Sequence, residues 1–112
     1  MGLPYMPFYV DDYYADTVGL SALTHAGYLL LILAYWKKGA ALPLDDKKLA
    51  GLAFMSKKEW LSVKDDVLVF FKIDEGTLVH PRIEKELAKA RDKIEKARLA
   101  GVASGEARTN GR

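Results

Sequence analysis

Hydrophobic positions divide the chain into short amphipathic segments separated by polar turns. The most apolar run is AGYLLLILAYW, residues 26–36. It is shorter than the ~20 residues that a membrane span needs, and no basic segment of the kind that opens a signal peptide precedes it. We therefore expect no membrane association. The pattern predicts a helix buried on nearly all sides, from Ser21 as N-cap to about Lys38, with Gly39 ending it.

A second helix is predicted after a connector or short strand at residues 40–44. Asp45 is a typical N-cap, and apolar residues recur on one face of the segment after it, namely Leu49, Leu52 and Ala53. This helix has to be short, because another helix-start signal comes almost directly after it.

That signal is MSKKEW, residues 55–60. Ser56 and Glu59 have the spacing of a capping box, and Met55 and Trp60 have that of a hydrophobic staple. The third helix should run to about residues 69–71. Its inner face is predicted to consist of Trp60, Val63, Val67 and Phe71, widened by Leu61, Leu68 and Phe70.

A β-hairpin and a last helix complete the pattern. Strands are predicted at residues 70–73 and 77–80, joined by Asp74-Glu75-Gly76, with the glycine placed for a positive φ. Pro81 suits the start of a helix over residues 82–99. The tail, residues 100–112, is small, polar and aperiodic, which is typical of disorder.

The N-terminal segment, residues 1–20, is predicted to be an extended arm. It is rich in aromatic residues, namely Tyr5, Phe8, Tyr9, Tyr13 and Tyr14. Such side chains can stack on the bases of a single strand, but more often they attach an arm to a core. We favour the second role, with one or two tyrosines left exposed.

The order of these segments predicts an α+β, mostly α fold. Three helices and a hairpin within residues 21–81 match a winged helix-turn-helix, a three-helix core with a β-hairpin wing. The helix over residues 82–99 is then an addition at the C-terminus.

Composition limits the chemistry. The chain has 112 residues, half of them apolar, which suffices for one domain with one core. It has no cysteine, which excludes disulfides, zinc–thiolate sites and cysteine nucleophiles, and fits a reducing compartment such as the cytoplasm.

No set of residues has the pattern of a catalytic or cofactor site. A metal site at His25 or His80, the two histidines, would need further ligands converging on it. The aspartate pairs at residues 11–12, 45–46 and 65–66 are scattered, as N-caps and exposed faces would be. There is no glycine-rich phosphate loop. We expect a protein without enzymatic activity and without a cofactor.

Several residues occur in the combination that is typical of one known family. They are Pro7, Tyr9, Asp12-Tyr13, Asp16-Thr17, Leu20-Ser21, the helix of residues 28–36, Gly39, Leu42-Pro43, Asp45, Trp60, Phe71, Gly76 and Arg82. Through them, over about residues 6–100, the chain resembles the YdaU-like family of prophage-associated domains of unknown function. That family is similar to the N-terminal winged-helix domains of phage replication proteins. The resemblance therefore implies association with DNA or with the replication machinery, and implies no catalytic residues.

Charge is distributed unevenly. Residues 1–36 contain no lysine or arginine, whereas residues 82–98 contain seven, against a net charge of +2 for the chain. On the last helix, five cations fall within about 80° of one another: Arg82, Lys85, Lys89, Lys93 and Lys96. They lie beside a narrow apolar stripe made by Ile83, Leu87, Ala90, Ile94 and Ala97.

This cationic flank has two compatible interpretations. The charges could border a helix–helix seam, or they could form a ridge that binds phosphates. The stripe beside them is also compatible with a homodimer through this helix.

The third helix is a weaker candidate for reading DNA. Lys57 and Lys58 lie in its first turn, where a recognition helix contacts DNA, and they oppose the helix dipole. The face opposite Trp60, however, is predominantly acidic: Lys58, Glu59, Ser62, Asp65, Asp66 and Val69. At most, the first turn should touch the DNA backbone.

These patterns support two functions. The first is a non-enzymatic, nucleic-acid-binding winged-helix module of phage or prophage origin, acting in DNA replication or its regulation. The alternative is a protein–protein adaptor that contacts replication proteins, such as a helicase or its loader, through Ser62, Asp65, Asp66 and Val69.

Overall fold

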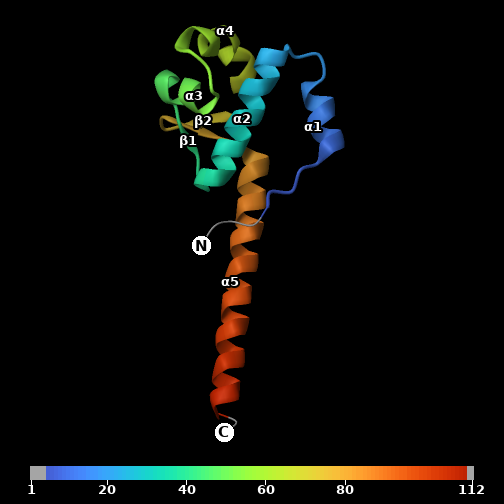
Figure 1. Ribbon diagram of the computed structural model, residues 1–112, viewed down its shortest axis with the longest axis vertical. Coiled ribbons are helices and arrows are strands. Elements are labelled where there is room, and N and C mark those ends of the chain that lie inside the picture. The colour runs from blue at the N-terminus through green and yellow to red at the C-terminus, as the bar shows by residue number, and fades with distance from the viewer. Residues whose placement is uncertain (1–4, 111–112) are drawn as a thin grey trace.

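The computed structural model describes residues 5–110, and for residues 102–110 it describes the backbone alone. The fold is α+β and mostly helical (Figure 1). The elements within the described residues are α1 (Val10–Thr17), α2 (Ala22–Lys38), β1 (Leu42–Pro43), α3 (Asp46–Leu52), α4 (Lys57–Leu68), β2 (Lys72–Asp74), β3 (Thr77–Val79) and α5 (Pro81–Asn110). No helix in this part of the chain combines the length and the apolar character needed to cross a membrane.

Helix α2 is the centre of the body, and α3, α4 and α5 pack around it. It begins and ends as predicted. The hydroxyl oxygen of Ser21 accepts a hydrogen bond from the Thr24 N–H at 3.1 Å, and Gly39 ends the helix with a φ of +74°. Its buried residues come from several sides of the helix, namely Thr24, Gly27, Tyr28, Leu31, Ile32, Tyr35 and Trp36.

Helices α2 and α4 approach each other closely at Gly27. A Cβ atom added there would lie 3.2 Å from the terminal carbon of Met55 and 3.4 Å from a methyl group of Val67. On α4, Trp60, Val63 and Val67 are buried, as predicted. The prediction for Leu61 was wrong, because 49% of this residue is exposed on the outer side of the helix.

The three strands form one antiparallel sheet in the order β1-β3-β2. Leu78, in the middle of the central strand, pairs with Leu42 on one side and Ile73 on the other, and it is fully buried. Strands β2 and β3 are joined by a two-residue turn with positive φ at both Glu75 (+46°) and Gly76 (+77°), which suits a tight hairpin. The strands are shorter than predicted, but the hairpin is confirmed.

The N-terminal arm is not extended throughout, so that prediction needs correction. Residues 10–17 form α1, which has Asp11 and Asp12 in its first turn, where acids favour a helix. The helix lies along the body rather than within it, and Figure 1 shows it beside α2. Tyr13 attaches it, because its ring stacks on Tyr28 with the centroids 5.9 Å apart. Residues 1–4 lie outside the described part of the chain.

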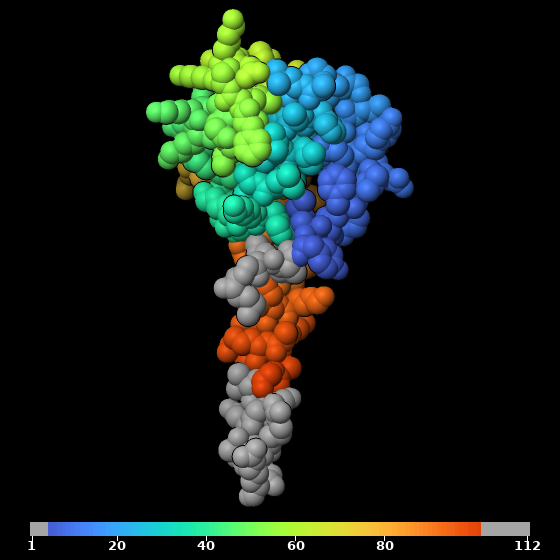
Figure 2. Space-filling view, viewed as in Figure 1, coloured from blue at the N-terminus to red at the C-terminus, as the bar shows by residue number. Residues whose placement is uncertain are grey.

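The last helix is longer than predicted. Instead of ending near residue 99 before a disordered tail, α5 continues to Asn110, and residues 111–112 lie outside the described part. Residues 100–110 contain no proline and several alanines, so nothing in them forces the helix to end. Only the first turns of α5 pack against the body, and the rest projects from it (Figures 1 and 2).

Candidate nucleic-acid interface

The start of α4 has the predicted capping box. The Ser56 hydroxyl oxygen accepts a hydrogen bond from the Glu59 N–H at 3.1 Å, and the Glu59 carboxylate accepts one from the Ser56 N–H at 2.9 Å. That backbone hydrogen bond is the main reason why the pKa of Glu59 is lowered. Lys57 and Lys58 are exposed in the same turn. The cap therefore holds the helix end in place while both lysines face solvent.

Helix α4 is tied to α3 by Asp46. One carboxylate oxygen of Asp46 accepts a hydrogen bond from the Trp60 indole N–H at 3.0 Å, and the Lys64 ammonium lies 2.9 Å from the same oxygen. The hydrogen bonds from Lys64 and Trp60, in that order, lower the pKa of Asp46. Trp60 itself is fully buried. This link holds α4 against the start of α3.

The outer face of α4 carries the acids expected there. Ser62, Asp65, Asp66 and Val69 are all exposed. The Ser62 hydroxyl donates to the Glu59 carbonyl at 2.6 Å, so it is occupied within the helix. Leu61 and Val69 add exposed apolar area to this acidic surface. Phosphate groups would be repelled along most of it.

The turn between α3 and α4 contains an exposed phenylalanine that sequence analysis did not single out. Phe54 is 83% exposed and has a φ of +58°. The Met55 N–H donates to the Ala50 carbonyl at 2.9 Å and the Phe54 N–H to the Gly51 carbonyl at 3.1 Å, which is the Schellman pattern at a helix end. Glycine is usual at this position, and an exposed aromatic residue takes its place here.

The first turns of α5 are fixed to the body by buried residues. Ile83, Leu87 and Ala90 of the apolar stripe are buried, so their partner is the body of the same chain. The Tyr35 hydroxyl donates to Glu84, and Arg91 donates to the carbonyl of Gly39 at the end of α2. Further along, Ile94 is half-buried and Ala97 is exposed. The orientation of the cationic flank is therefore set by packing.

All five predicted cations of α5 are exposed on this flank, which we call the ridge: Arg82, Lys85, Lys89, Lys93 and Lys96. Three of them have acidic neighbours. Asp16 lies 3.8 Å from Arg82, Glu86 lies 3.6 Å from Lys89, and Asp92 lies 3.0 Å from Lys96. Among the described side chains, Lys85 and Lys93 have no acid within ion-pair distance. Exposed pairs of this kind contribute little free energy, so phosphate can replace the carboxylates.

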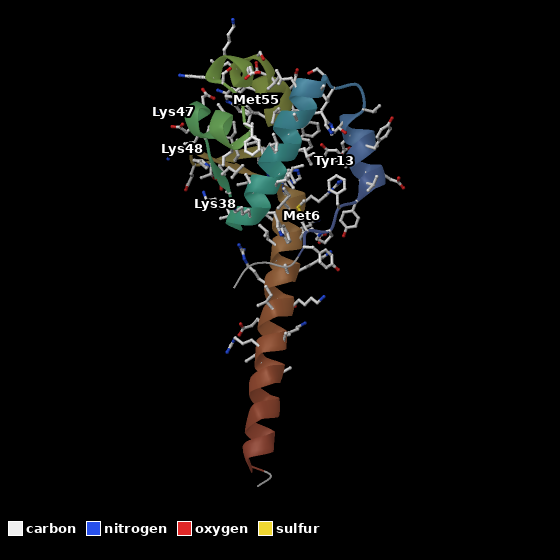
Figure 3. The ribbon with its side chains drawn as sticks, viewed as in Figure 1. Met6, Tyr13, Lys38, Lys47, Lys48 and Met55 are labelled. Atoms are coloured by element: carbon white, nitrogen blue, oxygen red, sulfur yellow. The ribbon has the colours of Figure 1, made fainter. Side chains whose placement is uncertain are left out.

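A second basic surface was not predicted from the sequence. Lys38 at the end of α2 and Lys47 and Lys48 on α3 border an open groove of about 530 Å³. Its other lining residues carry no charge: Ala34, Leu42, Pro43, Gly51 and Leu52. The three lysines lie on the side of the body away from α1 (Figure 3). The sequence gives one indication of this surface: Lys47 and Lys48 lie in the first turn of α3, where cations oppose the helix dipole. Nothing in the sequence near Lys38 indicates that it lies at the same groove.

A small pocket of about 50 Å³ lies between the arm, α2 and the start of α5. His80 and Tyr28 line it, with the His80 Nε2 atom 2.8 Å from the Tyr28 hydroxyl oxygen. The other ring nitrogen, Nδ1, accepts the Ile83 N–H at 3.2 Å. Both nitrogens are thus used internally, which leaves His80 no free base for chemistry. Among the described residues, no three histidine or carboxylate side chains are placed to hold a metal ion.

Comparison with known proteins decides the family. A family described as "Protein of unknown function (DUF1376)" matches residues 4–88. The chain belongs to this family. It is also 42% identical, over 106 residues, to "Uncharacterized protein YdaU" from Escherichia coli (strain K12). That alignment covers 95% of the chain and 36% of the relative, so the chain spans about a third of the relative's length. No solved structure matches the chain.

The DUF1376 match ends within the ridge. Arg82 and Lys85 lie inside the matched region, whereas Lys89, Lys93 and Lys96 lie beyond it. Helices α1 to α4, the hairpin and the groove beside Lys38 all lie inside the matched region. The family match therefore covers the body, whereas the alignment with the Escherichia coli relative, over 106 residues, also extends into the projecting part of α5.

Proposed function

We propose that the chain is a non-enzymatic nucleic-acid-binding module with a winged-helix arrangement. The element order α2-β1-α3-α4-β2-β3 and the sheet order β1-β3-β2 support this arrangement, with β2 and β3 as the wing. A role in phage or prophage DNA replication, and a place in the cytoplasm, rest on the resemblance to the YdaU-like family and on the absence of cysteine.

The observation that carries the proposal is the ridge. From Arg82 to Lys96, one flank of a single helix exposes five cations over ~21 Å, at 1.5 Å per residue. At ~3.4 Å per nucleotide along one strand, this length matches about six nucleotides. Several phosphates can be bound at once, with little dependence on base sequence.

The ridge is a better nucleic-acid contact than α4. Lys57 and Lys58 stand at one end of α4, but Asp65 and Asp66 come within two further turns on exposed positions. A nucleic acid placed along α4 would meet these charges, whereas one placed along the ridge meets mostly cations. The proposal therefore assigns the main contact to α5 and leaves α4 at most a backbone contact by its first turn.

Fluorescence anisotropy with labelled single-stranded and duplex DNA, at several salt concentrations, tests this function. We expect binding that weakens steeply as salt rises, by roughly −0.9 in log–log slope for each phosphate on duplex DNA. Absence of binding to either form at low salt would contradict it.

A second candidate, a protein–protein adaptor, is favoured by the surface of α4. Apolar side chains are exposed there beside acids: Leu61 and Val69 with Asp65 and Asp66, and Phe54 in the turn before the helix. Exposed aromatic and aliphatic anchors within a polar border are typical of protein contacts. A helicase or its loader would be the partner if the chain acts in replication. Pull-down of such a protein by the wild type but not by Phe54→Ala would support this candidate.

A further inference from the structure

A groove at the middle of the ridge combines aromatic and cationic side chains. It has a volume of about 130 Å³ and is bordered by Tyr5 of the arm, Trp36 of α2, and Lys89 and Lys93 of α5. One water needs ~10–15 Å³ by this measure, so the groove has room for a planar ring. Figure 2 shows the coloured part of the arm beside α5 where the helix leaves the body.

Tyr5 is placed as a stacking surface. It is 85% exposed, and no ring contact within the described part of the chain occupies its face. Two other aromatics of the arm are engaged: Tyr13 stacks on Tyr28, and the Tyr9 hydroxyl donates to Glu86 at 3.1 Å. The arm is thereby held against the body and α5, and Tyr5 is presented next to the lysines.

The charge in the groove favours an anionic ligand. Lys89 and Lys93 are one helical turn apart on the same flank, and both are exposed. Among the described residues that line the groove, the one acid is Glu86. It accepts the Tyr9 hydroxyl and lies 3.6 Å from Lys89, and only 12% of its side chain is exposed. Its charge is therefore largely compensated, and the exposed groups are the two cations and the tyrosine.

We propose that this groove binds an unpaired base of a single-stranded nucleic acid, stacked on Tyr5, with the neighbouring phosphates on Lys89 and Lys93. Stacking on an aromatic side chain is tolerant of sequence and needs a base whose face is free. Bases inside a duplex are already stacked and paired, so a duplex can reach the ridge lysines but not Tyr5. The inference rests on the proposed function and adds to it a preference for single strands.

The test compares variants of the full chain by fluorescence anisotropy. The probes are a labelled oligothymidylate of about twelve nucleotides, twice the ~6 that the ridge spans, and a duplex of the same length. Tyr5→Ala should weaken single-strand binding roughly tenfold, while duplex binding and the salt dependence stay unchanged, because no charge is removed. Tyr5→Phe should retain the affinity, since it keeps the ring.

Tyr14→Ala is the matched control, because Tyr14 is also exposed (67%) but lies on the acidic helix α1. It should bind both probes like the wild type. Unchanged single-strand affinity in Tyr5→Ala, or an equal loss for both probes, would overturn the inference. In either case the proposed function survives as long as the wild type binds DNA. If the wild type binds neither probe at low salt, the proposed function itself fails.

Discussion

The Nε2 atom of His80 lies 2.8 Å from the hydroxyl oxygen of Tyr28, which joins the start of α5 to the middle of α2. His80 also caps α5, because its Nδ1 atom accepts the Ile83 N–H. A nitrogen that accepts cannot carry a proton, so the proton of the neutral ring sits on Nε2 and is donated to Tyr28. A neutral histidine thus both caps α5 and joins it to α2.

This relationship predicts that the protein loses stability in mild acid. Burial is the main cause of the lowered pKa of His80, followed by the nearby Arg82. In the unfolded chain, His80 therefore takes up a proton near pH 6.5. In the folded protein, His80 stays neutral to a lower pH. The contribution of His80 is complete above about pH 6.5 and declines as the pH falls below that value, by at most ~1.4 kcal/mol per pH unit.

Urea unfolding between pH 7.5 and pH 5 measures this effect. His80→Asn is the informative variant, because asparagine can still cap the helix but does not titrate. Its free energy of unfolding should depend less on pH over this range than that of the wild type. Identical pH dependence in the two proteins would show that His80 is not the group responsible.

The cap of α4 gives a second prediction. Ser56→Ala should lower the free energy of unfolding by ~0.5–2 kcal/mol, since it removes the acceptor for the Glu59 N–H and breaks the capping box. Ser62→Ala, whose hydroxyl only donates back to the Glu59 carbonyl, is the control and should change stability much less. Thermal melts in which Ser56→Ala equals the wild type would contradict the role of this cap.

Trp60 gives a third prediction. Its side chain is fully buried, and its indole N–H donates to Asp46. Trp60→Ala should destabilise the protein by ~3–5 kcal/mol through the cavity it leaves. In a Trp36→Phe background, the fluorescence of Trp60 should be that of a buried indole. Emission typical of a solvated indole would mean that the inner face of α4 is wrongly assigned.

Phe54 gives a fourth prediction: its replacement by glycine should stabilise the folded protein. A residue with a side chain costs roughly 1–2 kcal/mol in the left-handed region, whereas glycine adopts it freely but adds ~0.5–1 kcal/mol of unfolded-state entropy. Phe54→Gly should therefore raise the free energy of unfolding by about 0.5–1 kcal/mol. Phe54→Leu keeps the strain and should not. Equal stability of the two variants would show that the φ of +58° stores no strain.

Local signals account for most of the predicted fold. Ser21, Asp45 and Ser56 all act as N-caps, and Gly39 ends α2, because capping depends on residues within one turn. The hairpin is set likewise by its turn residues. These features could be predicted because the physical cause lies next to its effect in the chain.

The features that could not be predicted depend on contacts distant in sequence. Helix α1 is attached through Tyr13 stacked on Tyr28, and no pattern within residues 1–20 indicates that pairing. The left-handed conformation of Phe54 was not predicted, because the residue that follows the C-cap of α3 is usually glycine or asparagine. The ridge could be placed on one flank from the helical period alone, but Asp16 beside Arg82 could not be foreseen.

The ridge itself is the fifth prediction and the central claim. Replacing Lys85, Lys89 and Lys93 together by glutamine removes three exposed cations and leaves the apolar stripe intact, so the protein should stay folded. The matched control is the double change of Lys57 and Lys58 to glutamine, which removes exposed cations from α4 instead. Both variants keep the charge on the remaining surfaces.

The most direct measurement is the salt dependence of binding to duplex DNA for the wild type and these two variants. The triple variant should bind more weakly, and its log–log salt slope should be shallower by as much as ~2–3, at roughly 0.9 for each phosphate that the protein no longer neutralises. The double variant should remain close to the wild type. If the double variant lost binding while the triple variant kept both its affinity and its slope, DNA would dock on α4 and the assignment of the ridge would be contradicted.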